Sequence, residues 1–311
     1  MKGLELSEKF YKEYGEPMLR EKFPDVYEKL AVGLVGSGSE CFGYDDLIST
    51  DHDFEPGFCI FLPDDIDRRT EFLLEREYSR LPKEFMGYRR STLSPFGGNR
   101  HGVIRMSDFF LGKTGSVDGR LTLEQWFSIP DQALLEAVNG KVFYDKTGRF
   151  TSVRERLSYF PRDVRLKKLA GEILLMGQAG KYNYFRCVER GDTAAAQLSA
   201  YEFVSHAIAA VFLINGKYMP YYKWRFRAFS ELDLLSELKE PFEFIISSGN
   251  KSEDFVLKEK MINEICDKIF DLLVKNGFSD YKGDTAEGHT DSINGKINDT
   301  DVRNLHVLYG V

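Results

Sequence analysis

The first half of the chain alternates short apolar runs with polar segments, a pattern that predicts a small sheet flanked by helices. Uninterrupted apolar residues at 31–35 and 58–62 predict buried strands. We expect three strands here, spanning 31–35, 52–62 and 101–106. Charged residues dominate 66–80, which predicts a surface helix.

Two further helical stretches are expected around the first strand. Apolar residues at helical spacing predict a helix over 5–30, with breaks near Gly15–Pro17 and at Pro24. Ser37 is followed three residues later by Glu40, which fits a capping box. We therefore expect a turn that leads into a short helix over 36–48.

The character of the chain changes after Pro161, where strand-like runs become scarce. Helical periodicity recurs over 163–179, 193–214 and 254–275, which predicts a bundle of long helices. Residues 279–300 are polar and rich in turn formers, so we expect a loop there before a last short helix.

These patterns together predict an α+β protein with a mixed β-sheet domain followed by an α-helical bundle domain. The expected divisions are an N-terminal helical segment over 1–30, a sheet domain over 31–155 and a bundle over 156–311. The 311 residues are enough for each domain to bury its own core.

Composition narrows the class of protein. The chain is 42% hydrophobic and 29% charged, as soluble globular proteins are. A net charge of −7 argues against non-specific binding of extended nucleic acid, which depends on lysine and arginine. The sequence shows no apolar signal region and no apolar run long enough for a membrane span, and its four cysteines form no Cys-x-x-Cys pair. We therefore expect a cytoplasmic protein without a membrane partner.

The densest chemistry lies between the first two apolar runs. Gly38-Ser39 lies just after the first run, and small residues in such a turn leave backbone N–H groups available for phosphate. Eleven residues (40–50) separate Ser39 from Asp51-His52-Asp53, and two carboxylates two residues apart on an extended segment face the same side. Oxygen ligands of this kind suit Mg²⁺ together with substrate phosphates. Neither a complete dinucleotide-binding fingerprint nor a P-loop is present in the sequence.

Gly-Ser, a spacer of this length and Asp-x-Asp resemble the signature of the nucleotidyltransferase superfamily, which includes DNA polymerase β and aminoglycoside nucleotidyltransferases. The wider segment 36–54 is similar to an uncharacterised bacterial group within it that carries a label of unknown function. Residues 215–224 resemble the helical half of the same group. The resemblance implies transfer of a nucleoside monophosphate from a nucleoside triphosphate to an acceptor, with two Mg²⁺ ions.

The resemblance also implies roles for individual residues. Asp51 and Asp53 would be catalytic metal ligands, and Gly38 and Ser39 would hold the terminal phosphates. The superfamily often uses a lysine from its helical half to contact the triphosphate, and Lys223 matches that position. A solvated surface helix is an equally good interpretation of the segment around Lys223.

A third carboxylate is the missing part of the pattern. The superfamily usually carries one on a later strand, yet 101–106 contains no acidic residue. Asp108 follows that strand and is the nearest candidate, although a role in the first turn of a helix fits it as well. Glu55 is a second candidate. Alternatively, substrate or water supplies the base, or the protein binds nucleotide without transferring it.

The sequence thus predicts a Mg²⁺-dependent nucleotidyltransferase whose donor is a nucleoside triphosphate, with ATP expected first. The expected acceptor is a hydroxyl group of a small molecule, with a protein or an RNA end as open alternatives. The alternative is a nucleotide-binding regulatory or interaction protein that has the same fold without catalytic activity.

Overall fold

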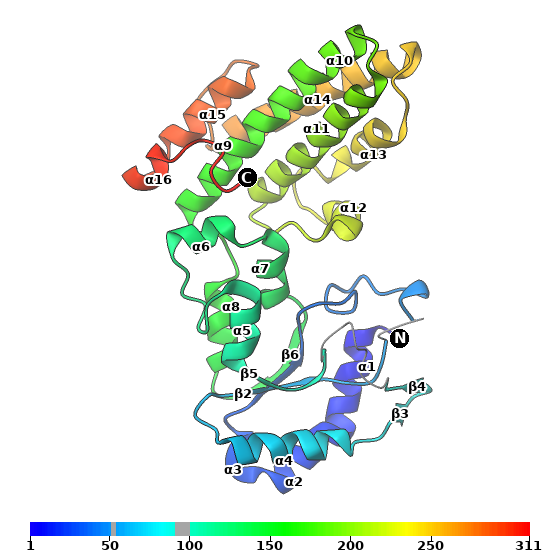
Figure 1. The fold of residues 1–311 in the computed structure, drawn as a ribbon, viewed down its shortest axis with the longest axis vertical. Helices are drawn as coiled ribbons and strands as arrows, with labels where there is room; N and C mark the ends of the chain where they lie inside the picture. Colours follow the sequence, from blue (N-terminus) through cyan, green and yellow to red (C-terminus); the bar gives the residue numbers. More distant parts are fainter. Residues whose placement is uncertain (51–53, 91–99) are drawn as a thin grey trace. The chain divides into compact units, whose positions relative to one another are not determined.

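The structure is a computed structural model that describes residues 1–50, 54–90 and 100–311. The described chain divides into two compact units. We call Met1–Gln125 together with Ile129–Ser158 the sheet unit. Trp126–Ser128 together with Tyr159–Val311 form the helical unit (Figure 1).

A four-stranded mixed sheet lies at the centre of the sheet unit, in the order β5-β2-β1-β6. Its strands are β1 (Ala31–Leu34), β2 (Cys59–Leu62), β5 (Gly102–Arg105) and β6 (Lys141–Asp145). Strand β1 is antiparallel to β2 and to β6, whereas β2 and β5 are parallel. A separate two-stranded sheet pairs β3 (Glu84–Phe85) with β4 (Tyr88–Arg89). The three predicted strands are confirmed, the second with a later start, and β6 was not predicted.

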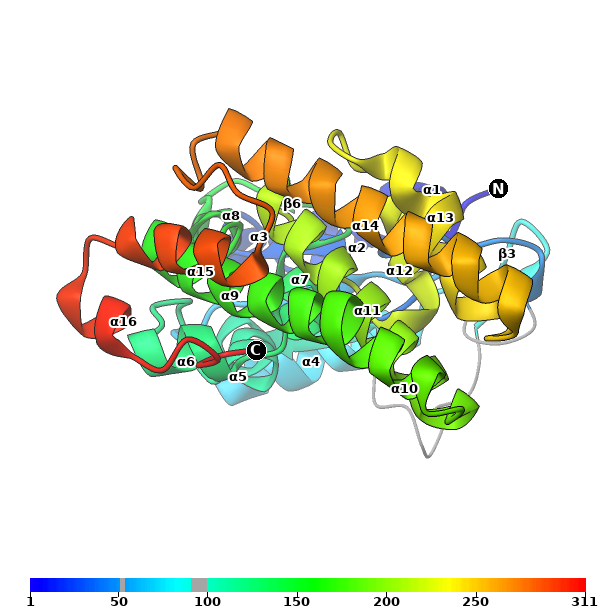
Figure 2. The same cartoon turned by 90° about the horizontal axis from the view of Figure 1, so that it is seen from above.

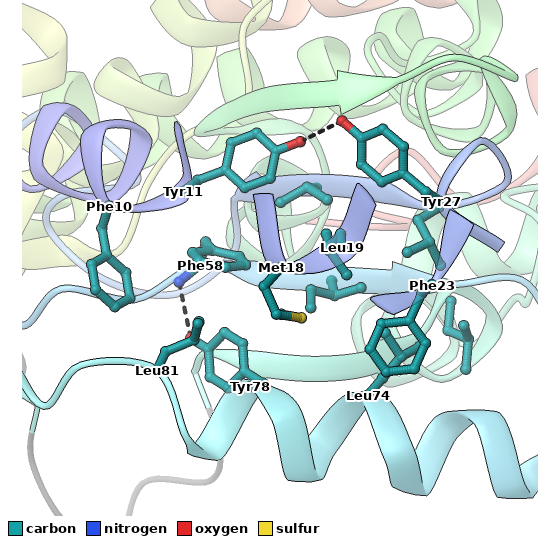
Figure 3. Packing of buried hydrophobic residues seen from close by; sticks show 14 of the residues in the cluster. Phe10, Tyr11, Met18, Leu19, Phe23, Tyr27, Phe58, Leu74, Tyr78 and Leu81 are labelled. Carbon is teal, nitrogen blue, oxygen red and sulfur yellow. Dashed lines mark hydrogen bonds between the residues drawn. The ribbon is translucent and has the colours of Figure 1, made fainter. Parts of the chain in front are cut away.

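Helices cover one face of the sheet through a large aromatic core (Figure 3). They are α1 (Gly3–Phe10), the π-helix η1 (Tyr11–Gly15), α2 (Glu16–Lys22), α3 (Pro24–Tyr27) and α4 (Arg68–Ser79). Phe58 is fully buried among them, and its backbone N–H donates to the Tyr78 hydroxyl at 3.1 Å. The hydroxyls of Tyr11 and Tyr27 lie 3.1 Å apart and form the second polar contact in this core.

The N-terminal helix follows the prediction with one difference. Helical backbone continues through the expected break near Gly15–Pro17, because the chain widens there into the π-helix η1. A Cβ on Gly15 would lie 2.4 Å from the Phe58 ring, so glycine lets this turn approach the sheet. The break at Pro24 is confirmed, since Phe23 leaves the helical conformation.

A second helical layer covers the opposite face of the sheet. It contains α5 (Met106–Thr114), α7 (Asp131–Val138) and α8 (Arg149–Arg156), and α6 (Leu123–Ser128) leads from this unit toward the other. Phe61 of β2 stacks on Phe150 of α8 with ring centroids 4.0 Å apart, and Phe109 of α5 packs on both. Both faces of β2 are therefore buried, as its uninterrupted apolar run predicts.

The helical unit is built along three long helices, α9 (Arg162–Gly177), α11 (Thr193–Ile214) and α14 (Ser252–Lys275). The chain continues from α9 through the π-helix η3 (Gln178–Tyr184) into α10 (Phe185–Glu189). The shorter elements are η4 (Tyr222–Trp224), α12 (Arg225–Phe229), η5 (Ser236–Leu238), α13 (Lys239–Ser247), α15 (Ala286–Gly295) and α16 (Thr300–Asn304). Both α11 and α15 pack along α9 (Figures 1 and 2).

The three predicted long helices are confirmed, but the predicted loop over 279–300 is wrong. Helix α15 occupies much of that range. Its start is capped by Thr285, whose hydroxyl accepts from the Gly288 N–H at 3.3 Å. His289 and Ile293 are buried on one face, so the helix forms against α9 in spite of its polar composition.

Helix α11 is long and apolar enough, by length and composition, to cross a membrane. Its 22 residues include an 18-residue window of mean hydropathy 1.4, and 61% of that window is buried inside the protein. Contacts with α9 and α13 account for this burial, which favours a core helix of the bundle.

Candidate functional site

One edge of the sheet collects the ends of all four strands around the turn formed by Gly36–Ser39. Because β1 is antiparallel to β2 and β6, its carboxyl end lies beside the amino ends of both. Strand β5 is parallel to β2 and therefore begins at the same edge. The Gly36–Ser39 turn, the segment entering β5 and the segment entering β6 consequently meet at this edge.

Two glycines give the turn its shape. Gly36 has φ of 104° and Gly38 has φ of 123°, conformations that residues with a side chain rarely adopt. The Asn139 side chain anchors Gly36 twice, accepting from its N–H and donating to its carbonyl, both at 2.8 Å. A Cβ on Gly38 would lie 1.7 Å from Arg100 Nη2, so the guanidinium occupies the space where a side chain would be.

The short helix predicted over 36–48 is wrong. The chain forms successive turns, with backbone bonds from Cys41 to Gly38 at 3.1 Å and from Tyr44 to Ser39 at 2.8 Å. A brief 3-10 helix, η2 (Ile48–Thr50), follows. The positive φ values of the two glycines are incompatible with a right-handed helix start.

The predicted capping box is also absent from this turn. The Ser37 hydroxyl donates to Glu136 Oε2 at 2.8 Å, and the Glu40 carboxylate pairs with Arg100. Within residues 1–50, 54–90 and 100–311, the backbone N–H groups of Ser37, Gly38 and Ser39 donate no hydrogen bond. Ser37 is exposed and the next two residues are partly exposed, so these consecutive donors are available to an anion.

Two cations lie beside these donors. Lys113, near the end of α5, donates to the Ser37 hydroxyl at 2.9 Å and forms an ion pair with Glu136. Arg100 donates to the Ser37 carbonyl at 3.0 Å. Both side chains are 23% exposed, so the positive charge next to the turn is within reach of solvent.

The two glutamates that hold these cations differ in electrostatics. Burial raises the pKa of Glu40, and the opposing effect of Arg100 is smaller. Burial also pushes up the pKa of Glu136, but hydrogen bonds from Gln132, Lys113 and Ser37 outweigh it and leave that pKa lowered. Glu136 is therefore held firmly as an anion that orients Lys113.

A histidine–glutamate pair lies at the same edge of the sheet. His101 directly precedes β5, and its Nδ1 is 3.1 Å from Glu55 Oε1. Gly57 lets the ring approach the backbone, because a Cβ there would lie 2.7 Å from the imidazole Cγ. In the described part of the chain, the second ring nitrogen of His101 has no hydrogen-bond partner.

The predicted site residues of the sheet unit fall into three groups. Gly38 and Ser39 form the turn, as described above. Asp51 and Asp53 lie outside the described residues. Asp108 is exposed in the first turn of α5, next to Ser107, which donates to Asp64 beyond the carboxyl end of β2. The structure thus places Asp108 at the opposite edge of the sheet from Gly38 and Ser39.

Lys223 belongs to the helical unit. It is exposed in η4, and its Nζ lies 4.9 Å from the centre of the Trp224 ring. Tyr221 and Tyr222 are 41% and 63% exposed, so the aromatic residues beside Lys223 do not all pack inward. The segment presents both cations and aromatic rings to solvent.

No group of three histidine, cysteine, aspartate or glutamate side chains within the described ranges could hold a metal ion. Glu40 and Glu136, the carboxylates that contact the turn or its cations, are engaged in ion pairs. The assignment of a metal to Asp51 and Asp53, which lie outside these ranges, stays a prediction from the sequence. Their carboxylate oxygens suit Mg²⁺.

Several residues of this edge gave no signal in the sequence. Arg100, Lys113 and Asn139 reach the turn from positions 63, 76 and 103 residues away along the chain. No local motif encodes such distances. The one available hint was the Asn139-Gly140 dipeptide, which is typical of a turn that precedes a strand.

The helical unit contains a groove of its own, with a volume of about 790 Å³. The end of α9, residues of η3 that include Lys181 and Tyr182, the start of α15 and residues 306–308 line it. Lys223, the predicted site residue of the helical unit, does not line this groove.

Comparison with known proteins gives a partial family match. A family model described as "Domain of unknown function (DUF4037)" matches residues 126–225. This range lies mostly in the helical unit and includes residues 215–224, which resemble the helical half of an uncharacterised bacterial group. The chain is similar to that family over less than half of its length. No curated protein shows significant sequence similarity to it.

Among solved structures, the chain is similar to a nucleotidyltransferase-like protein from Exiguobacterium sibiricum 255-15. The two share 10% sequence identity with a TM-score of 0.36, over 87% of this chain and 77% of that chain. A likeness of this strength does not establish a common function. The strands and helices described above do confirm the predicted α+β class.

Proposed function

We propose that the protein is a Mg²⁺-dependent nucleotidyltransferase that moves a nucleoside monophosphate from a nucleoside triphosphate to a hydroxyl acceptor. The observation that carries the proposal is the Gly36–Ser39 turn, where three consecutive N–H groups that bond no described residue lie beside Lys113. Backbone donors of this kind, next to a cation, bind phosphate.

The roles follow from the chemistry of each group. The N–H groups of Ser37, Gly38 and Ser39 would bind the terminal phosphates, and Lys113 would exchange part of its contact with Glu136 for phosphate oxygen. Asp51 and Asp53 would hold Mg²⁺, which neutralises phosphate charge and orients the reacting phosphoryl group when bound. Lys223 is proposed as a further phosphate contact from the helical unit.

We expect ATP as the donor and a small molecule as the acceptor, since the net charge of −7 disfavours extended nucleic acid. We also propose a cytoplasmic location. All four cysteines are free thiols, which agrees with a reducing compartment.

One observation favours a second candidate, a protein that binds nucleotide without transferring it. The described carboxylates of the turn, Glu40 and Glu136, are engaged in ion pairs, and Asp108 lies at the other edge of the sheet. Glu55, the other predicted candidate for the third carboxylate, lies at the turn edge of the sheet but is paired with His101.

Calorimetric titration with each nucleoside triphosphate in the presence of Mg²⁺ tests the site. The wild type should bind at least one triphosphate, and the Asp51→Asn/Asp53→Asn double variant should lose that binding. The Asp64→Asn/Asp65→Asn variant is the matched control, because it removes two adjacent acids after β2, at the other edge of the sheet. Equal binding by the wild type and the Asp51→Asn/Asp53→Asn variant would show that the assigned site is wrong.

A transfer assay then separates the two candidate functions. ATP labelled on its α-phosphate is incubated with the wild type, Mg²⁺ and a panel of hydroxyl acceptors, and pyrophosphate is measured. Release that depends on Asp51 and Asp53 supports the transferase. Tight ATP binding without release under any condition supports the binding protein instead.

A further inference from the structure

The Glu55–His101 pair lies at the turn edge of the sheet, beside the residues that hold the Gly36–Ser39 turn. Glu55 precedes β2 and His101 precedes β5, and these strands are parallel neighbours. Arg100, the residue before His101, bonds the Ser37 carbonyl at 3.0 Å. His101 is therefore the immediate chain neighbour of a residue that contacts the proposed phosphate site.

We propose that His101 is the general base that activates the acceptor hydroxyl, with Glu55 as its positioning residue. This inference rests on the function proposed above and adds the base that the missing third carboxylate would supply. The Glu55 carboxylate accepts a hydrogen bond from Nδ1–H of the imidazole. Among the described residues, the lone pair on Nε2 is then left to take a proton from a substrate. The arrangement is that of a histidine oriented by a carboxylate.

His101 Nε2 takes the proton of the acceptor hydroxyl while the acceptor oxygen forms a bond to the α-phosphorus. The bond between that phosphorus and the oxygen bridging to the β-phosphate breaks, and pyrophosphate leaves with the electron pair. The imidazolium, stabilised by the Glu55 carboxylate, then returns its proton to solvent.

A second histidine–glutamate pair is an example of a histidine with a purely structural role. In the helical unit, His206 Nδ1 lies 2.7 Å from Glu172 Oε2, and its Nε2 lies 3.4 Å from Glu202 Oε2. Both ring nitrogens of His206 thus face carboxylates. His101 differs, because only its Nδ1 is engaged by the described residues.

The test uses the full chain with ATP and Mg²⁺, and it measures pyrophosphate release with water and with glycerol as acceptors. A base directed at the α-phosphate activates water as well, so the wild type should release pyrophosphate with water alone. His101→Gln should reduce release by about 10²- to 10⁴-fold, the usual contribution of a general base. ATP affinity measured by calorimetry should remain that of the wild type.

Four further variants distinguish a catalytic role of His101 from a structural one. Imidazole added to His101→Ala should restore part of the release, which a purely structural role of the ring would not allow. Glu55→Ala should lower release more than Glu55→Gln, because glutamine keeps an oxygen that can accept from Nδ1. His206→Gln is the matched control and should release pyrophosphate at the wild-type rate.

The possible failures are distinguishable. If His101→Gln keeps wild-type release while Asp51→Asn/Asp53→Asn loses it, the base is wrong and the proposed function stands. If the aspartate variant also keeps wild-type binding and release, the proposed function itself is wrong. If the wild type binds ATP but releases no pyrophosphate, the pair is not a base and the binding protein is the better description.

Discussion

Lys113 of the sheet unit and two buried lysines of the helical unit have opposite surroundings. In the sheet unit, Lys113 is partly exposed and contacts one hydroxyl and one carboxylate beside the Gly36–Ser39 turn. In the helical unit, Lys167 and Lys258 are fully buried. Each of these two is bound by three neutral oxygen atoms of the protein.

Lys113 is therefore available to a ligand, whereas the buried lysines stabilise the fold. The Lys167 ammonium joins the Asn294 side chain to the carbonyls of Arg303 and Leu305, so it ties the C-terminal segment to α9. Burial lowers the pKa of Lys167, the expected effect for an ammonium without a carboxylate partner. Lys113, in contrast, keeps solvent access and a carboxylate partner that phosphate can replace.

The largest expected effect is on stability, in Lys167→Met. The substitution removes the ammonium from three oxygens, of which Arg303 O keeps a hydrogen bond from Asn294 Nδ2. We expect it to lower the free energy of unfolding by about 3 kcal/mol. Urea unfolding followed by circular dichroism measures this change. Lys260→Met is the control, because Lys260 is exposed and should contribute about 0.5 kcal/mol or less. Equal stability of the two variants would contradict the fastening role.

The next largest effect is expected for Gly38→Ala. The positive φ and the displaced Arg100 guanidinium should together cost about 2 kcal/mol of stability. ATP affinity should fall by about tenfold or more, because the N–H groups of the turn move. Gly43→Ala is the matched control, since Gly43 also has a positive φ but no atom within 4 Å of the added carbon. ATP binding should therefore remain intact in Gly43→Ala.

Lys113→Met should have a smaller effect that falls on binding and not on folding. We expect ATP affinity to drop by about tenfold, or roughly 1.4 kcal/mol. ATP affinity is measured by calorimetric titration and stability by urea unfolding, for Lys113→Met and Lys167→Met side by side. If Lys113→Met destabilised the fold as much as Lys167→Met while ATP binding was unchanged, Lys113 would be a structural lysine like Lys167.

The smallest expected effect is a pair of opposite pH dependences at the turn. The Glu136 pKa is lowered from 4.5, so its contribution to stability is present above pH 4.5 and is lost as pH falls through the folded pKa. The Glu40 pKa is raised from 4.5, so its contribution is present below pH 4.5 and is lost as pH rises through the folded pKa. Each should amount to about 1 kcal/mol or less.

Urea unfolding between about pH 3.5 and 7 resolves these two dependences. Relative to the wild type, Glu136→Gln should lose the acid-side decrease in stability, and Glu40→Gln should lose the decrease on rising pH. Two difference curves with the same sign would contradict the assignment of the two carboxylates.

The parts of the fold that sequence predicted are those decided by local pattern. The apolar run at 31–35 is β1, and the periodic stretch at 193–214 is α11. Helix α15 was missed because its buried face includes His289 and Thr290, which do not register as an apolar stripe. The short helix over 36–48 was wrong because the backbone conformation of Gly36 and Gly38 overrides the apparent capping box.

The candidate site likewise contains residues that a local motif predicted and residues that only folding brings together. Gly38 and Ser39 belong to a contiguous motif, and they do form a turn with available N–H groups. Lys113 and Arg100 reach that turn only after the sheet has formed, so no spacing in the sequence could identify them. The metal-binding roles of Asp51 and Asp53 stay predictions.

The double anchor between Asn139 and Gly36 also has a consequence for chemical ageing. Asparagine followed by glycine loses ammonia readily, when the glycine nitrogen attacks the side-chain amide and forms a cyclic imide. Here the Asn139 amide is held by two hydrogen bonds of 2.8 Å, and the Gly140 N–H donates to the Cys41 carbonyl at 2.9 Å. The folded turn therefore shields its most fragile dipeptide. Each opening of the turn exposes it to an irreversible change that leaves an aspartate or isoaspartate beside Gly36, so deamidation records how often the turn has opened.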